Sequence, residues 1–299
     1  MFTSLNKAWY VSATIAMSAL FMSACTIDKP SDNAAPASHA DTQSDGADIS
    51  PTLAPSGKPA MPTINAQEHS ANSLTLSAIP GVDFYVEGME SVVSGLGYTI
   101  APWSTIKVPL VMAALHNNSG ENNQQIVAWA QQAIRDSDNE AAQKLWESLG
   151  DPETAAAAVE AEIAQAASYA EVPALPPREG YSSYGQSTWS LVDQVAYISH
   201  IPRDAQVIAL MGDIRVGGGY GLGTIPGAIY KSGWGPDEAG RYGVRQFGLI
   251  PHPDNPQQYS AVALCAQAPS GTYEDAQQLL TQAVQEIYAH LELVTAAHA

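Results

Sequence analysis

The chain alternates between two hydrophobic periods, and these periods predict its elements. Runs in which apolar and polar positions alternate every second residue, such as "YSAVALCAQA", are typical of strands. Runs with apolar residues three or four positions apart are typical of amphipathic helices. We expect strands over 82–88, 91–100, 228–232, 241–250 and 259–266, and helices over 102–115, 124–134, 139–149, 152–167, 187–201 and 270–294.

The order of these elements indicates the fold class. Two strands that form a hairpin come first, a block of helices follows, and three strands and a helix end the chain. This order predicts an α/β (α+β) fold, in which both chain ends build one mixed sheet and helices cover it. Residues 171–185, "EVPALPPREGYSSYG", are rich in proline and glycine, so we expect a loop there.

The N-terminal segment predicts export from the cell. Lys7 precedes an apolar run over residues 8–22, and "MSAC" follows, ending at Cys25. This is the anatomy of a signal peptide over residues 1–24, and the small residues before the cysteine resemble a bacterial lipobox. That resemblance implies a lipid on the Cys25 thiol. An ordinary secretory peptide cut near Ala24 is the alternative.

Behind this cysteine, the sequence divides into a tether and a domain. Residues 25–70 are rich in Ser, Asp, Ala and Pro and lack a hydrophobic period, which is typical of a flexible tether. Residues 71–299 carry the periodic runs and form the expected domain. We therefore expect an extracytoplasmic monomer that its lipid anchors to a bacterial cell membrane.

The composition excludes several classes of function. The formal net charge is -18, with 12 Lys and Arg against 30 Asp and Glu, so nucleic acid is not an expected partner. The histidines are scattered and the two cysteines lie far apart in the sequence, so we predict no metal site and no cofactor. Cys265 lies in an apolar, alternating run and has the pattern of a small buried hydrophobe.

One lysine interrupts the apolar run "IAPWSTIKVPLVMAAL". Lys107 follows Ser104 by three residues, so on a helix both lie on one face. A serine hydroxyl becomes a good nucleophile when a base takes its proton, and burial among apolar groups lowers the pKa of a lysine towards that of a base. The alternative is a lysine that extends out of the helix into water.

Two further short motifs favour chemistry. "RDSDNEAA" places Ser137, Asp138 and Asn139 at the start of a helical run, where the same residues also serve as helix caps. "YKSGWG" places Lys231 and Ser232 at the end of an expected strand, which a glycine turn alone would also explain. The three motifs together, in this order and on these elements, are rare by chance.

S-x-x-K, S-D-N and K-[ST]-G are the signature of penicillin-binding proteins and class A β-lactamases, and this chain resembles them. The resemblance implies a mixed antiparallel sheet with flanking helices and a reduced all-α subdomain, with the site in the cleft between them. It implies that a β-lactam or a peptidoglycan stem peptide acylates the nucleophile, Ser104. It implies that Lys107 is the base, that Ser137 relays a proton and that Asp138 has a structural role. The residues implied to bind substrate are Asn139, Lys231, Ser232, Gly233 and Trp234. The backbone N–H groups of Ser104 and Trp234 would form the oxyanion hole.

The expected loop departs from the class A pattern of a glutamate followed four residues later by asparagine. Glu171 is followed four residues later by Leu175, and Glu179 by Ser183. Fast hydrolysis of an acyl-enzyme is therefore not expected, and the sequence leaves the choice between β-lactamase and D,D-peptidase open. A catalytically weak or inactive lipoprotein that binds peptidoglycan or a protein partner is the alternative function.

Overall fold

A computed structural model describes residues 78–89, 91–118, 123–203 and 205–297. The expected signal peptide, Cys25 and the tether lie outside these residues. No helix in the described ranges is long and apolar enough to cross a membrane. The elements in chain order are β1 (Val82–Val86), α1 (Leu96–Thr99), the 3₁₀ helix η1 (Trp103–Ile106), α2 (Lys107–Asn117), α3 (Asn123–Arg135), α4 (Asn139–Glu147), α5 (Pro152–Ala164), β2 (Ala170–Glu171), η2 (Tyr184–Gln186), β3 (Thr188–Trp189), α6 (Leu191–His200), α7 (Gln206–Met211), η3 (Gly221–Thr224), β4 (Ile229–Pro236), β5 (Tyr242–Pro251), β6 (Tyr259–Gln267) and α8 (Tyr273–Ala297).

A four-stranded sheet in the order β1-β6-β5-β4 forms the centre of the molecule. Its first strand comes from the N-terminal end of the described chain and its other three from the C-terminal part, as the sequence predicts. Every pairing is antiparallel, which confirms the antiparallel sheet with flanking helices that the resemblance implies. Strands β4, β5 and β6 are buried along nearly their whole length, because helices cover both faces of the sheet.

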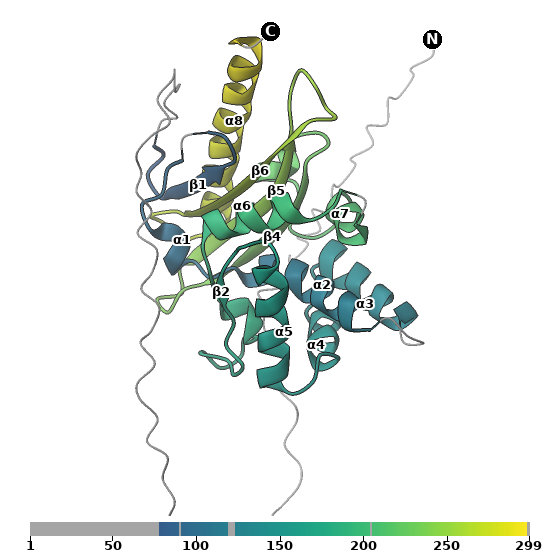
Figure 1. Ribbon diagram of the computed structural model, residues 1–299. Helices are drawn as coiled ribbons and strands as arrows, with labels where there is room; N and C mark the ends of the chain where they lie inside the picture. The colour runs from purple at the N-terminus through teal and green to yellow at the C-terminus, as the bar shows by residue number, and fades with distance from the viewer. Residues whose placement is uncertain (1–77, 90, 119–122, 204, 298–299) are drawn as a thin grey trace, which may run out of the picture.

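The helices form a layer on each face of the sheet and a separate block beside it. Helix α8 packs on one face, and α6 packs on the other, as Figure 1 shows. Helices α2, α3, α4 and α5 pack on one another and form the all-α part. Two apolar cores result: the α8 side of the sheet packs around Leu264 and Leu280, and the other side continues from Phe247 into the α2–α5 block at Leu110.

The structure confirms most expected elements and corrects one of them. Residues 91–100, which we expected to form a second strand of a hairpin, contain a single β-bridge, Phe84 to Val92, and then the short helix α1. The reason is Asp83, whose buried carboxylate accepts hydrogen bonds from the backbone N–H groups of Ser94, Gly95 and Gly97 and bends the chain away from the sheet. Helix α7 was not predicted at all.

Candidate active site

Ser104 lies in η1, where the chain passes close to strand β4. The residue before it, Trp103, has a left-handed backbone (φ 49°), and Ser104 itself is 4% exposed. A Cβ atom on Gly233 would lie 2.4 Å from the Pro102 carbonyl oxygen and 2.9 Å from the Ser104 nitrogen. Gly233 therefore lets β4 approach the backbone of Ser104, while the substrate binding that the resemblance implies for it stays a prediction.

Lys107 stands at the junction of η1 and α2, and it is fully buried. Because residues three apart eclipse one another in a 3₁₀ turn, its side chain leaves the helix on the same side as that of Ser104. Its Nζ donates to the Ser137 carbonyl at 2.7 Å and to the Asp138 carbonyl at 3.2 Å. It also donates to Oδ1 of Asn139 at 2.7 Å. The lysine thus joins the first motif to the second.

The loop between α3 and α4 presents Ser137 to two lysines at once. Ser137 has a left-handed backbone (φ 54°), which turns its carbonyl oxygen towards Lys107. Its hydroxyl oxygen accepts a hydrogen bond from Nζ of Lys231 at 3.0 Å. Asp138 fixes this conformation, because its carboxylate accepts from the Ala141 nitrogen at 2.6 Å and caps α4. This is the structural role that the resemblance implies for Asp138.

Lys231 and Ser232 lie inside β4, which continues to Pro236 rather than ending at the motif. Lys231 is fully buried, and its Nζ also donates to the Ser232 carbonyl at 2.9 Å. The hydroxyl of Ser232 is buried on the other face of the strand, where it donates to the Gly217 carbonyl at 2.6 Å. To bind a carboxylate, as the sequence suggests, this hydroxyl has to leave that bond. Trp234 packs its ring against Tyr273 of α8, and its backbone directly follows Gly233.

Gln246 and Arg178 are two residues near the site that sequence reasoning missed. Gln246, fully buried in β5, donates to the Ser232 hydroxyl at 2.9 Å and accepts from the Leu222 nitrogen at 2.7 Å. A polar residue within the apolar run of β5 was the signal for it. Arg178 contacts the ring of Trp103 from the loop after β2, and no local pattern marks it.

Three arginines on or before the last strands, Arg215, Arg241 and Arg245, occupy different places. Arg245 is fully buried in β5 and donates to the carbonyls of Trp189 and Gly97. Arg241 forms an ion pair with Asp237 at the exposed end of the β4–β5 hairpin. Arg215 contacts the segment that carries Ser137: its backbone nitrogen donates to the Arg135 carbonyl, two residues before Ser137.

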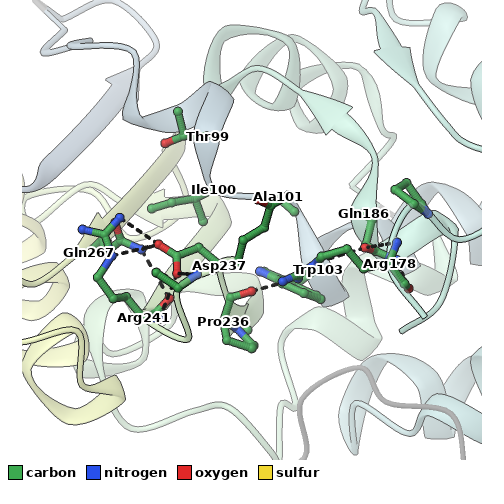
Figure 2. A pocket seen from close by; sticks show the side chains of 15 residues that line it. Thr99, Ile100, Ala101, Trp103, Arg178, Gln186, Pro236, Asp237, Arg241 and Gln267 are labelled. Carbon is green, nitrogen blue, oxygen red and sulfur yellow. Dashed lines mark hydrogen bonds and ion pairs between the residues drawn. The ribbon is translucent and has the colours of Figure 1, made fainter. Parts of the chain in front are cut away.

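The loop glutamates lie on the surface. Glu171 is exposed in β2, where its backbone pairs with Thr188, and Glu179 is exposed in the loop. A pocket of about 480 Å³ opens beside this loop, between Arg178, the end of α1 and the β4–β5 hairpin (Figure 2). Trp103 and Gly235 belong to its lining, whereas Ser104, Lys107 and Lys231 do not.

Comparison with solved structures identifies the fold. The TLA-3 extended-spectrum β-lactamase is 14% identical, with a TM-score of 0.55 over 71% of this chain and 93% of its own. A class A β-lactamase from Bacteroides cellulosilyticus is 13% identical, with a TM-score of 0.53 over 71% of this chain and 91% of its own. PBP-A is 18% identical, with a TM-score of 0.52 over 73% of this chain and 92% of its own. The chain has the β-lactamase-like fold.

At these identities the likeness concerns the β-lactamase-like fold alone. No protein-family model and no curated protein matches the sequence. A mutant of PBP-A with glutamate in place of a leucine has a solved acyl-enzyme complex with penicillin G, TM-score 0.51. The fold of the superfamily that the three motifs suggested is thus confirmed, and the chemistry of this chain has to be argued from its own residues.

Proposed function

We propose that this protein is an active-site-serine hydrolase or acyl transferase, acylated at Ser104 by β-lactams or by peptides of the D-Ala-D-Ala type. The observation that carries the proposal is the bridge that Ser137 makes between two fully buried lysines, Lys107 and Lys231. These residues come from three separate elements that meet beside η1, and each side chain is of a type that can move protons. Buried cations are costly to a fold unless partners compensate them, so their convergence favours a function.

The proposed reaction follows from these contacts. Lys107, in its neutral form, takes the proton of the Ser104 hydroxyl, and the oxygen attacks the carbonyl carbon of the substrate. The backbone N–H groups of Ser104 and Trp234 stabilise the oxyanion. The proton then passes through the Ser137 hydroxyl to the leaving nitrogen as the amide bond breaks. Lys231 keeps the site positive and attracts the substrate carboxylate, which matters in a chain whose net charge is -18.

The exposed positions of Glu171 and Glu179 support a long-lived acyl-enzyme. A water that hydrolyses the ester needs a base within hydrogen-bond reach, and both loop carboxylates face solvent in this structure. We therefore propose a D,D-peptidase, or a slow β-lactamase, in preference to a fast one. We further propose that the protein acts as a monomer outside the cytoplasm, attached to the cell membrane by a lipid on Cys25, on a β-lactam or a stem peptide.

The buried hydroxyl of Ser232 favours a second candidate function. This hydroxyl is hydrogen-bonded to Gly217 and Gln246, away from the lysines. A site in which Ser232 does not reach the substrate could bind peptidoglycan or a protein partner without turnover. The two candidates differ in whether a covalent adduct forms on Ser104.

Intact-mass spectrometry of the purified protein with a penicillin tests the proposal. We expect the mass to rise by one drug molecule in the wild type and not in Ser104→Ala. The adduct should persist long after a fast β-lactamase would have hydrolysed it. Absence of an adduct at high drug concentration would refute the proposed reaction and favour the binding function.

A further inference from the structure

Arg178 ties the proline-rich loop to two other parts of the molecule. Its Nη2 donates to the Pro236 carbonyl at the end of β4, at 2.8 Å. Its Nε and its backbone nitrogen both donate to Oε1 of Gln186, at 3.3 and 3.1 Å, and the Gln186 amide donates back to the Arg178 carbonyl. One side chain therefore connects the loop, the strand that carries Lys231, and η2.

The same guanidinium covers the ring of Trp103. Its carbon lies 5.5 Å from the Trp103 ring centroid and 4.7 Å from that of Tyr181, and the two rings meet edge to face at 5.4 Å. On the other side, a Cβ atom on Gly235 would come within 2.4 Å of the Trp103 ring. Trp103 is thus held between the loop and β4, as Figure 2 shows for its Arg178 side.

Trp103 adopts a backbone conformation that a bulky residue avoids. A positive φ costs a non-glycine residue on the order of 1 kcal/mol, so the surrounding contacts must maintain it. Trp103 is 2% exposed and directly precedes Ser104 in η1. A change in the Trp103 backbone would therefore move both the nitrogen and the hydroxyl of Ser104 relative to β4.

Within the described residues, Arg178 forms no ion pair with a carboxylate. Its charge is stabilised by two aromatic rings, a carbonyl and an amide oxygen. Removing the side chain therefore leaves no carboxylate unpaired, and the fold should survive the loss. Arg203 offers a matched control, because its guanidinium lies 5.2 Å from the ring centroid of Tyr259.

We propose that Arg178 is a positioning residue for the nucleophile: it holds Trp103 in its left-handed conformation and thereby sets Ser104 against β4. The role deepens the proposed function and rests on it for its kinetic consequence. It concerns the rate of the acylation step, because Arg178 orients the reacting group. It does not concern the affinity for the substrate, which lies with Lys231 and Asn139.

Single-turnover acylation by a penicillin, measured over a range of concentrations, separates the two quantities. In Arg178→Ala we expect the limiting acylation rate to fall about tenfold or more, since a small misplacement of a reacting group is costly, with the half-saturating concentration little changed. Arg178→Lys keeps the cation near the rings but loses the planar guanidinium, so its acylation rate should lie between those of the wild type and Arg178→Ala. Arg203→Ala should acylate at the wild-type rate.

Hydrogen exchange provides a readout that does not depend on acylation. Amides of η1 should exchange faster in Arg178→Ala than in the wild type, and those in Arg203→Ala should not change. A wild-type rate in Arg178→Ala, or a weaker half-saturation with an unchanged rate, would overturn the positioning role. If the wild type itself forms no adduct, the proposed function fails, and unchanged η1 exchange in Arg178→Ala would then reject the positioning role separately.

Discussion

Two fully buried basic residues lie on one face of the same sheet, on neighbouring strands. Arg245 belongs with Asp83 to a structural group of polar contacts, and Lys231 belongs with Lys107 and Ser137 to a lysine group. Lys231 of β4 is paired with Phe247, and Arg245, two residues earlier in β5, is paired with Gly233, so both side chains project from one face. Arg245 is bonded to the backbone carbonyls of Trp189 and Gly97. Lys231, in contrast, is bonded to a side-chain hydroxyl as well as to a carbonyl.

The difference between the groups lies in what their partners can do. Around Arg245, Asp83 receives four hydrogen bonds from residues 94–97, and this network holds that segment against the sheet. Around the lysines, the partners include the Ser137 hydroxyl and the Asn139 amide, which can exchange protons or turn towards a ligand. Loss of the first group should therefore affect stability, and loss of the second should affect reaction rate.

The largest expected effect belongs to Lys107→Ala. Removal of a general base lowers the reaction rate by a factor of about 10²–10⁴, so acylation of Ser104 should become barely measurable by intact mass. The protein should still unfold cooperatively in urea, because α2 keeps its apolar contacts. Lys144→Ala is the control, since Lys144 forms an exposed ion pair with Glu140. Ser104 in this variant should be acylated at the wild-type rate. Equal acylation in both variants would remove Lys107 from the mechanism.

The next effect is the converse, a loss of stability in Asp83→Ala. The substitution leaves the backbone N–H groups of Ser94, Gly95 and Gly97 without their acceptor, and each unsatisfied buried group costs about 1–3 kcal/mol, so the free energy of unfolding should fall by about 3 kcal/mol or more. Urea denaturation measures this loss, and the folded fraction should acylate at the wild-type rate. Asp151→Ala also removes a carboxylate that receives backbone hydrogen bonds, but at an exposed helix start, and should lose much less. Similar losses in the two variants would mean that the Asp83 network does not matter for the fold.

The sequence predicts which segments meet better than it predicts what surrounds them. The motifs around Ser104, Ser137 and Lys231 are local, and the structure brings all three segments together as expected. The turn of residues 91–100 away from the sheet was not predicted, because it depends on Asp83, which lies in a different run of the chain. Arg178 was missed for a similar reason: its partners Trp103 and Pro236 are distant in sequence, and only the fold brings them together.

The smallest expected effect is the pH dependence due to Cys265, which lies beside Arg245 in the structural group. Burial raises the pKa of the Cys265 thiol to about 12, against the opposing effect of the neighbouring Arg245 guanidinium. The unfolded thiol ionises at about pH 8.5, so the folded state holds a proton that the unfolded state has lost. Stability should therefore fall as pH rises from about 9 towards 12, by about 1.4 kcal/mol per pH unit at most.

Cys265→Ala separates this contribution from that of other groups that titrate in the same range. Urea denaturation at pH 7 and at pH 10 should show that the wild type loses about 1–2 kcal/mol more than the variant between the two pH values. The cavity that the substitution leaves lowers stability at both pH values and cancels in the difference. Cys265 of the folded wild type should also resist alkylation by iodoacetamide at pH 8, while Ser104 in the same sample reacts with penicillin. Rapid alkylation of Cys265 in the folded protein would show that water reaches the structural group around Arg245. The contrast between that group and the lysine group would then be lost.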